Sequence, residues 1–339
     1  MINRDFKIKE RSVGGGARPY IIAEIGSNFD QSLDLARRLI DECAAAGVDA
    51  VKFQLFRAGG MYPEGSELYD IFKSIELSPD WLVPLKEHAD GCGVHFLASP
   101  FDQLSVDRLV DIGVPAMKLA SSETTKLGFV QYVASKNMPV LMSTGMCDLV
   151  DVIEGVNACK RVGNDDIGVL QCGARYPLPV EQSNLQAIDM MRELFGCPVG
   201  FSDHTEGLVA AIAATARHAA IIEKHVTLDR SSAGPDHFFA LETKDLGEFV
   251  RSICDAHAAL GNGEKEMLAE EKEVGRREGL HASRDLKKGE TISESDFVKS
   301  RPAIGMRSRY AETVVGAIAK NDIEKNQPIF WDAIIPSVE

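Results

Sequence analysis

Eight short apolar runs alternate with segments of helical periodicity between about residue 20 and residue 260, and this alternation constrains the fold more than any other feature. Apolar runs this short are typical of strands buried on both faces, and the segments 32–46, 127–135, 206–218 and 244–260 are typical of helices. Eight strand–helix units over about 250 residues predict a (β/α)8 barrel. A doubly wound open sheet is the competing architecture, and the count of eight favours the barrel. The predicted strands are 20–25, 50–56, 95–98, 116–120, 139–142, 167–171, 199–201 and 219–222.

Two histidines follow the last two predicted strands at matching positions. His204 comes shortly after the run 199–201, and His225 after the run 219–222, with Asp203, Glu223 and Asp236 close by in the sequence. Parallel strands joined by a helix place their carboxyl ends at the same edge, so both imidazoles would lie together there. Imidazole and carboxylate groups in this arrangement predict a divalent-metal site. The alternative interpretation is two unrelated histidines, one buried and one exposed.

Two lysines interrupt predicted strands that should be nearly all apolar. A single lysine in such a strand is explained by a side chain that extends to the barrel rim, but Lys52 and Lys118 would reach the same face. That face, at the carboxyl ends of the strands, is where barrel enzymes build their active sites. We therefore predict a cradle for phosphate and carboxylate groups. Its members would be Lys52, Lys118, Arg175, Ser99, Ser121 and Ser202.

The C-terminal part of the chain differs in composition from the rest. Residues 1–262 form the expected barrel domain, which begins with an irregular lead-in over 1–18. Residues 263–279 are a charged linker or a solvated helical turn. Residues 280–339 form a small domain in which 285–297 and 322–334 repeat an Asp–aliphatic start, a Lys at the fourth position and an Ile at the eighth. A unit this small buries little apolar surface, so we expect it to dock on another surface.

Charge and cysteine content exclude several classes of partner. The formal net charge of −14 argues against nucleic acid or an anionic membrane surface as a partner, so an anionic substrate needs locally placed cations. No apolar run approaches the ~18 residues of a membrane span, and the N-terminus is too polar for a secretion signal. Seven dispersed cysteines without a CxxC pair favour a reducing, cytoplasmic setting over a disulfide framework.

Seven short motifs occur in order at barrel spacing: AEIG at 23–26, VKFQ at 51–54, SPF at 99–101, STGM at 143–146, GFSDHT at 200–205, EKH at 223–225 and GPD at 234–236. From about residue 20 to the C-terminus the chain resembles the bacterial sialic acid (nonulosonic acid) synthases. The resemblance implies a (β/α)8 TIM barrel followed by a C-terminal antifreeze-like (SAF) domain. The loop 66–80 is more similar to the members that make legionaminic-type or spore-coat sugars than to the N-acetylneuraminate type.

The resemblance implies condensation of phosphoenolpyruvate with an N-acyl amino-hexose of the mannosamine type, giving a nine-carbon 2-keto sugar acid and phosphate. It implies that His204 and His225 bind Mn²⁺ or Mg²⁺ and that Glu24 or Glu123 manages a proton. It also implies a domain-swapped homodimer, in which Arg301 reaches the sugar's acyl group in the neighbouring barrel. The residues implied for phosphoenolpyruvate are Lys52, Ser99, Lys118, Ser121 and Ser202, and those for the sugar are Glu24, Gln54, Glu123, Tyr176 and Asp236.

Two departures from the family pattern leave the sugar open. Asn28-Phe29 stands where much of the family has Asn-His, and Ala174 stands where sialic acid–specific members have an Asn, so we predict that Arg175 or a water replaces that hydrogen bond. Three alternative functions remain. They are another metal-dependent 3-deoxy-ulosonate synthase, a barrel aldolase with Lys52 or Lys118 as Schiff-base nucleophile, and a catalytically silent sugar-binding paralogue.

Overall fold

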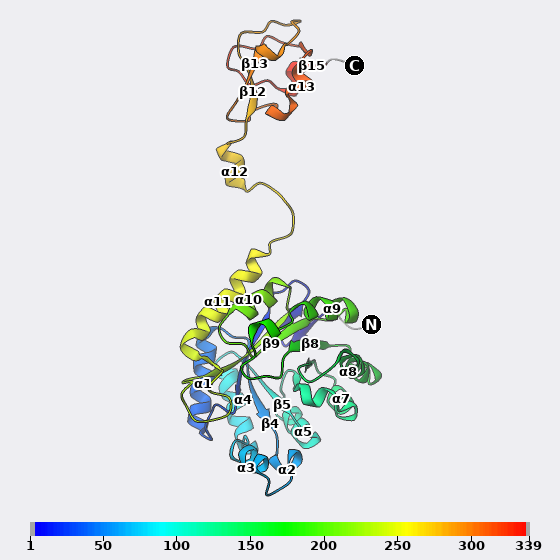
Figure 1. Ribbon diagram of the computed structural model, residues 1–339, viewed down its shortest axis with the longest axis vertical. Coiled ribbons are helices and arrows are strands. Elements are labelled where there is room, and N and C mark those ends of the chain that lie inside the picture. The colour runs from blue at the N-terminus through cyan, green and yellow to red at the C-terminus, as the bar shows by residue number, and fades with distance from the viewer. Residues whose placement is uncertain (1–3, 337–339) are drawn as a thin grey trace. The chain divides into compact units, whose positions relative to one another are not determined.

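The computed structural model describes residues 4–336 and divides the chain into two compact units, one ending at Gly261 and one beginning at Asn262 (Figure 1). The first unit contains eight parallel strands with helices outside them, which confirms the predicted (β/α)8 barrel. Its strands are β3 (Tyr20–Gly26), β4 (Ala50–Leu55), β5 (His95–Pro100), β6 (Met117–Leu119), β7 (Val140–Ser143), β8 (Ile167–Cys172), β9 (Val199–Asp203) and β10 (Ile221–Thr227).

The strands are hydrogen-bonded in the order β5-β4-β3-β10-β9-β8-β7-β6, and β5 and β6 lie against each other at the two ends of this order. The barrel is therefore nearly closed, and β11 (Leu241–Glu242) adds a short pairing to β10. The helices of this unit are α1 (Leu33–Ala46), α2 (Ala58–Met61), α3 (Glu67–Ser74), α4 (Leu82–Gly91), α5 (Gln103–Asp111), α6 (Ser121–Thr124), α7 (Leu127–Ala134), α8 (Leu149–Arg161), α9 (Gln186–Phe195), α10 (Val209–Ala216) and α11 (Thr243–Ala259), with 3-10 turns η1 (Pro79–Trp81) and η2 (Val180–Gln182).

Helix α1 illustrates how the sequence sets an element of the outer ring. The Ser32 hydroxyl accepts the N–H of Leu35 at its start, and Gly47 adopts a left-handed conformation at its end, which an L-residue with a side chain rarely does. Its buried residues recur at helical spacing, so one face packs on the strands while charged residues face outward. These buried residues are Ala36, Leu39, Ile40 and Cys43.

The prediction of an irregular lead-in over 1–18 was wrong for residues 5–14, whereas 15–18 contain no strand or helix and 1–3 lie outside the described residues. Strands β1 (Asp5–Ile8) and β2 (Arg11–Gly14) form an antiparallel hairpin whose Phe6, Ile8 and Val13 are buried in one apolar cluster with the lower interior residues of the barrel. The hairpin closes the end of the barrel where the strands begin. Asp5–Ile8 does alternate between exposed polar and buried apolar residues, but a run of four residues is too short to predict a strand by itself. Burial against the barrel interior stabilises both strands.

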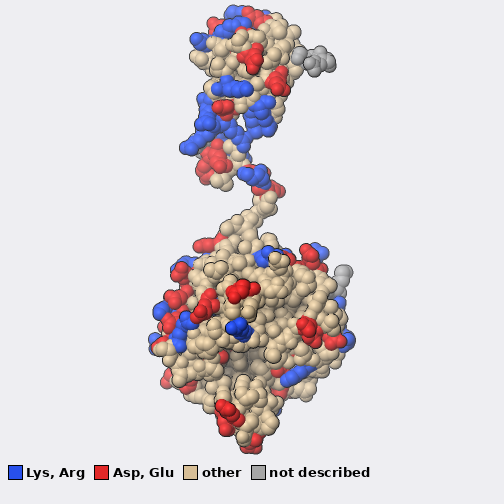
Figure 2. Space-filling model, in the orientation of Figure 1, with Lys and Arg blue, Asp and Glu red and all other residues tan. Residues whose placement is uncertain are grey.

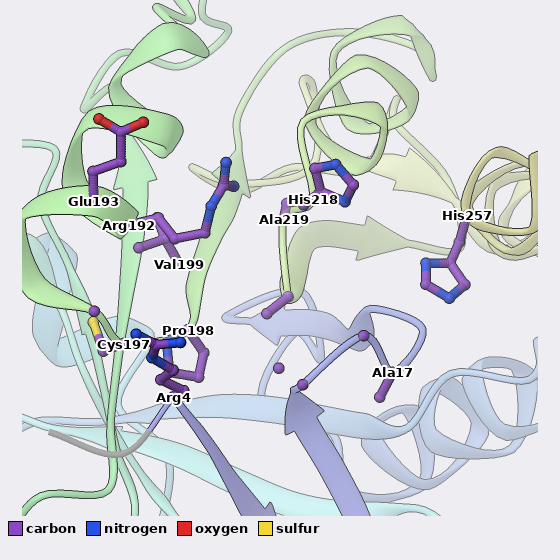
Figure 3. A pocket seen from close by; sticks show the side chains of 15 residues that line it. Arg4, Ala17, Arg192, Glu193, Cys197, Pro198, Val199, His218, Ala219 and His257 are labelled. Carbon is purple, nitrogen blue, oxygen red and sulfur yellow. The ribbon is translucent and has the colours of Figure 1, made fainter. Parts of the chain in front are cut away.

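A cavity of about 470 Å³ opens beside this hairpin (Figure 3). Arg4, Arg192, His218 and His257 are among the residues that line it, together with the glycine run at 14–16. Val199, at the start of β9, also lines this cavity. The cavity therefore lies at the end of the barrel opposite to the carboxyl ends of the strands. None of the residues that line it belongs to the predicted site.

The second unit has its own core and is described by itself. Its elements are α12 (Ala269–Val274), β12 (Gly279–Ala282), η3 (Glu294–Asp296), β13 (Phe297–Ser300), η4 (Ser308–Tyr310), α13 (Ala311–Val314), β14 (Ile318–Ala319), η5 (Trp331–Ala333) and β15 (Ile334–Ile335). Strands β12 and β13 pair antiparallel, as do β14 and β15. Leu280, Ile292, Met306 and Ile329 are fully buried in its core. The segment predicted as a linker contains the short helix α12.

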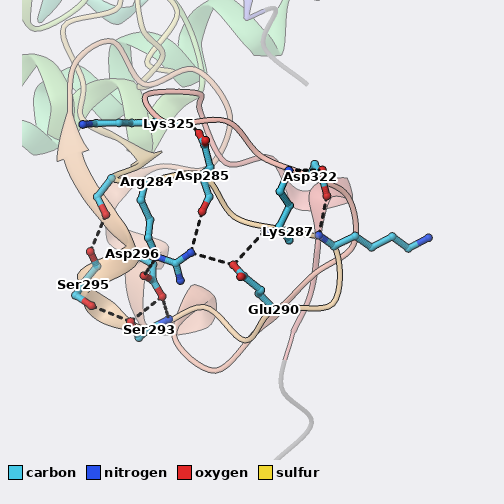
Figure 4. A network of polar contacts seen from close by, with 11 residues as sticks. Arg284, Asp285, Lys287, Glu290, Ser293, Ser295, Asp296, Asp322 and Lys325 are labelled. Carbon is cyan, nitrogen blue, oxygen red and sulfur yellow. Dashed lines mark hydrogen bonds and ion pairs between the residues drawn. The ribbon is translucent and has the colours of Figure 1, made fainter.

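The internal repeat corresponds to a reciprocal pair of turns (Figure 4). Leu286 and Ile323, at the second position of each repeat, exchange both backbone hydrogen bonds. The Asp285 carboxylate accepts the N–H of Lys325, and the Asp322 carboxylate accepts the N–H of Lys288, so each repeat supports the turn of the other. The duplicated residues therefore occupy equivalent places in one small core, where Ile292 and Ile329 are both buried.

Charged side chains of both signs are interspersed over the face of the barrel unit that Figure 2 shows. Within residues 4–336, no helix is long and apolar enough to cross a bilayer. All seven cysteines are free thiols, as expected from their dispersed positions.

Candidate active site

The interior of the barrel changes from apolar to polar between two successive layers of side chains. Side chains on a strand point to alternate faces, so every second residue points into the barrel. The lower layer is an apolar cluster that includes Ile22, Ala50, Leu97, Ala116, Leu141, Leu170 and Ile221. Two residues further along the strands, the upper layer consists of Glu24, Lys52, Ser99, Lys118, Ser143, Cys172, Ser202 and Glu223.

Gly200, at the level of the lower layer, allows β9 and β10 to approach each other closely. A Cβ on Gly200 of β9 would lie 2.5 Å from the carbonyl oxygen of Ile221 on β10, which is too close for any side chain. Ile221 fills the space instead, and Ser202 and Glu223 follow side by side one layer above. The close approach therefore brings the ends of β9 and β10 together beneath the two histidines.

Two lysines and two glutamates form a buried charge cluster at the centre of the upper layer. Lys52 Nζ lies 2.8 Å from Glu24 Oε2 and 3.5 Å from Glu223 Oε2. Lys118 Nζ lies 3.2 Å from Glu223 Oε1, so Glu223 joins the two lysines. All four side chains are at most 5% exposed. Their formal charges sum to zero, because two buried lysines without partners would be too costly to desolvate.

The predicted cradle contains no carboxylate, whereas in the structure Glu24 and Glu223 pair with its two lysines. The residue that sequence reasoning missed is Glu223, which we considered only as a neighbour of the histidines. The signal that could have found it is the alternation of β10, in which Ile221, Glu223 and His225 share one face. The two lysines and Glu223 lie on β4, β6 and β10, and β6 is not paired with either of the other two.

Burial and charge pairing move the pKa values of this cluster in opposite directions. Burial raises the pKa of Glu24, although Lys52 opposes this shift. Burial would lower the pKa of Lys52, but Glu223 and Glu24 outweigh it and raise that pKa. Burial lowers the pKa of Lys118, whereas Lys118 and Lys52 outweigh burial at Glu223 and hold its pKa well below the usual range. A carboxyl group with a raised pKa beside an ionised one is a common setting for proton transfer.

Serine hydroxyls surround the cluster and connect it to three further strands, β5, β7 and β9. Ser99 and Ser143 accept from Lys52 and Lys118 at 3.2 and 2.6 Å. Ser202 donates to Glu223 at 2.7 Å, and Gln54 donates to Glu24 at 2.9 Å. The predicted residues Gln54, Ser99 and Ser202 are thus brought together with the lysines, and Ser143 is an addition.

The two histidines lie next to each other at the ends of β9 and β10, with ring centroids 5.4 Å apart. The Gly173 carbonyl accepts from Nδ1 of His204 at 2.7 Å, which leaves Nε2 free to bind a ligand. Nδ1 of His225 is buried without a hydrogen-bond partner and lies 4.0 Å from the Asp236 carboxylate. Burial lowers the pKa of His204 to about 3 and that of His225 to about 4, so both rings are neutral at physiological pH.

A neutral imidazole is the form that binds a metal, and an orphaned buried nitrogen is a group that a cation would satisfy. The residues present therefore fit a divalent metal. In the described part of the chain, no third imidazole, thiol or carboxylate joins both histidines within 4.8 Å, which leaves coordination positions for water or substrate oxygens.

Aromatic rings cover the histidines. The ring of Tyr176 lies 4.2 Å from that of His204 and 6.0 Å from that of His225, measured between centroids. Phe239, which sequence reasoning missed, lies 5.0 Å from His225. Asp236 lies near Glu24, since a Cβ on Gly26 would be 2.9 Å from Oδ2 of Asp236 and 3.6 Å from Oε1 of Glu24.

Four predicted residues are not part of this cluster. Glu123 is buried but pairs with Lys126 at 2.8 Å, and Ser121 is half-buried at the start of α6. Arg175 is exposed and hydrogen-bonds Gln182 in its own loop, so it does not take the place we predicted beside the lysines. Arg301 is exposed on the second unit.

The departure at Asn28-Phe29 has a packing explanation. Phe29 is buried in the outer core, where its ring lies 6.0 Å from Phe53 and 6.1 Å from Trp81. Asn28 donates to the Val226 carbonyl at 2.9 Å, and its own carbonyl oxygen is buried without a partner. Position 29 therefore contributes to the core, while Asn28 holds the start of the β3 loop against the end of β10.

Comparison with known proteins agrees with the fold. Residues 39–265 match the NeuB family and residues 277–335 match the SAF domain. The chain is 34% identical to the N,N'-diacetyllegionaminic acid synthase of Legionella pneumophila, over 95% of this chain and 96% of that protein. It is 35% identical to the spore coat polysaccharide biosynthesis protein SpsE of Bacillus subtilis, over 97% of each.

The structure is also similar to that of the N-acetylneuraminic acid synthetase of Leptospira borgpetersenii, with a TM-score of 0.76 and 31% identity over 80% of this chain and 95% of that chain. Both the barrel and the small domain thus match the same group of synthases in the same order. The chain is therefore an enzyme of the NeuB family of nonulosonic acid synthases, with a (β/α)8 barrel followed by a SAF domain.

Proposed function

We propose that this enzyme condenses phosphoenolpyruvate with an N-acyl amino-hexose of the mannosamine type, giving a nine-carbon 2-keto sugar acid and phosphate. The observation that carries the proposal is the buried cluster of Lys52, Lys118 and Glu223 directly beneath the paired histidines. It provides fixed cations for a phosphate and a carboxylate next to a position where a metal would contact the sugar. The names of the relatives support the same substrate class.

We assign the metal to His204 and His225, with Mn²⁺ or Mg²⁺ as the ion. When bound, such an ion would supply Lewis acidity that polarises the sugar's carbonyl group. The protein's own contribution is to orient the two imidazoles and to keep them neutral by burial. Tyr176 and Phe239 exclude water from the side of the rings that they cover.

Lys52 and Lys118 hold the phosphate and carboxylate of phosphoenolpyruvate in this proposal, with hydroxyls of Ser99, Ser143 and Ser202 beside them. An entering dianion competes with Glu24 and Glu223 for the ammonium groups. Glu24 is the better candidate for proton transfer, because its pKa is raised by burial, whereas Glu123 is paired with Lys126. Gln54 and Asp236 lie beside Glu24, where we place the sugar.

The decisive experiment measures phosphate release from phosphoenolpyruvate with a panel of N-acylated mannosamine-type sugars, including a diacetamido sugar, in the presence of Mn²⁺ or Mg²⁺. We expect release with at least one sugar and a product with the mass of the corresponding nine-carbon keto acid. The paired variant His204→Ala/His225→Ala should give no release while it stays folded. No release with any sugar would identify a silent sugar-binding paralogue.

One observation favours a second candidate. The pKa of Lys118 is lowered by burial, and a lysine of lowered pKa is the usual Schiff-base nucleophile of a barrel aldolase. Borohydride treatment with pyruvate separates the two reactions. A trapped adduct on Lys118 would support the aldolase, and the condensation that we propose predicts no adduct.

We also propose a homodimer in which Arg301 of one protomer serves the barrel of the other, and a cytoplasmic location, which the seven free thiols support. Mixing Arg301→Ala with His225→Ala should restore part of the activity that each variant lacks. Absence of complementation after demonstrated subunit exchange would contradict the shared site.

A further inference from the structure

A second group of metal-ligating side chains lies on the outer helices of the barrel. The group consists of Asp41 of α1, His88 of α4 and Cys92, which follows directly after α4 as its C-cap residue. Among the residues that the structure describes, this group brings one nitrogen, one sulfur and one oxygen donor within 4.8 Å of one another. None of these residues belongs to the candidate active site.

The spacing of the three residues explains why they meet. His88 and Cys92 are four residues apart, so they lie on the same face of the last turn of α4. Cys92 keeps right-handed helical dihedral angles, which continue this face to the end of the helix. Helices α1 and α4 pack against each other in the outer ring, and this packing brings Asp41 opposite both side chains (Figure 1).

The contacts among the three donors are centred on the Asp41 carboxylate. Its Oδ1 lies 2.7 Å from Nε2 of His88 and 3.4 Å from Sγ of Cys92. Ligands of one tetrahedral zinc ion are about 3.3–3.8 Å apart. A cation therefore needs the histidine nitrogen and the carboxylate oxygen to move apart by roughly 0.7 Å, and the sulfur and that oxygen by a few tenths of an ångström, relative to this hydrogen-bonded arrangement.

From this geometry we propose that Asp41, His88 and Cys92 form a second metal site that binds Zn²⁺ or a cation of similar softness. The mixed nitrogen, sulfur and oxygen set suits zinc better than Mg²⁺ or Mn²⁺, which prefer oxygen-rich sites. The fourth position is open to water, since the side chains of His88 and Asp41 are 30% and 56% exposed. The site is independent of the two histidines at the barrel mouth.

Binding couples to protonation and to stability. The thiolate is the form of cysteine that binds a metal, so an ion that enters the site displaces a proton from the sulfur of Cys92. The ion replaces two hydrogen bonds by bonds that link α1 to α4. A ligand that binds only the folded chain lowers the unfolding equilibrium constant about 100-fold at 100 times its dissociation constant. Micromolar zinc should therefore raise the melting temperature of the barrel.

The test uses the full chain with His204→Ala/His225→Ala as the parent, which removes the metal ligands of the mouth. Titration with Co²⁺ should produce a saturable near-ultraviolet sulfur-to-cobalt band at one ion per chain. Cys92→Ser should abolish this band and His88→Ala should weaken binding at least about tenfold. Cys254→Ser is the matched control, because Cys254 is also a half-buried free thiol on an outer helix, and it should keep the band.

A second measurement compares melting temperatures with and without Zn²⁺. The rise expected for the parent should be absent in Cys92→Ser and in Asp41→Asn, which changes only an exposed carboxylate. The absence of a thiolate band in the parent would overturn the proposal. A band that survives Cys92→Ser would also overturn it, because the sulfur ligand would then be another thiol, such as Cys172 in the barrel interior.

Discussion

Substitution of Glu223 by Gln tests whether the charge cluster is held together as we describe. The change keeps the size of the side chain and an oxygen for Ser202, but removes the negative charge shared by Lys52 and Lys118. Each lysine attracts Glu223 by about 5 kcal/mol at these distances for an effective dielectric constant of 20. The net loss is smaller than the sum, because Gln is cheaper to bury and Glu24 no longer meets a second carboxylate.

The loss has an upper bound that depends on pH. Among the described residues, the ion-pair partner of Lys118 is Glu223, so without Glu223 the folded protein can keep Lys118 neutral. Relative to the unfolded chain, where the pKa of lysine is about 10.4, removing this proton costs about 5 kcal/mol at pH 7. We therefore expect Glu223→Gln to lower the free energy of unfolding by about 3–5 kcal/mol at pH 7. At pH 9 the proton costs only about 2 kcal/mol to remove, so the deficit should shrink. The folded-state pKa of Glu223 is depressed, so its contribution is present above the unfolded value of about 4.3 and disappears as pH falls through the folded value.

Unfolding in urea, followed by helical circular dichroism, reports on the barrel, because α1 to α11 all lie in the first unit. The matched control is Glu206→Gln, which removes the same charge from an exposed pair with Arg230 and should cost no more than about 1 kcal/mol. A Glu223→Gln protein within 1 kcal/mol of the wild type at pH 7, with no change at pH 9, would refute the account of the cluster given above.

Three further predictions concern the proton donor, the hairpin and the barrel floor. Glu24→Gln should lower kcat by about 10²–10⁴-fold with the substrates found in the panel, and unchanged turnover would exclude Glu24 as the proton-transfer group. Ile8→Ala should destabilise the barrel by about 2–5 kcal/mol, because Ile8 is fully buried against the barrel interior. An unchanged midpoint of urea unfolding would contradict this packing. Burial lowers the pKa of His95, whose Nδ1 lies 2.6 Å from the Tyr20 hydroxyl, so folding favours the neutral ring and stability falls as pH drops below about 6.5. His95→Gln should remove up to about 1.4 kcal/mol of this loss per pH unit. If the free energy of unfolding fell with the same slope for the wild type and for His95→Gln between pH 6.5 and 5, the prediction would be wrong.

The sequence predicted the barrel and the pair of histidines because both depend on local patterns. The eight apolar runs have strand length, and His204 and His225 follow two of them at the same offset. Parallel pairing then brings the ends of β9 and β10 together without any further information. The repeat in the C-terminal domain was predictable for the same reason, since 285–297 and 322–334 carry the same residues at the same positions.

Only the tertiary structure decided which charges meet inside the barrel. Lys52, Lys118 and Glu223 are far apart in the sequence, and Lys118 reaches Glu223 across the interior from a strand that is not paired with β10. The hairpin of β1 and β2 likewise depends on the apolar floor that it covers, and the exposed Arg175 depends on its loop. The amino-acid pattern determines which face each side chain takes, but the balance between desolvation and pairing is set by distances that exist only once the barrel has closed.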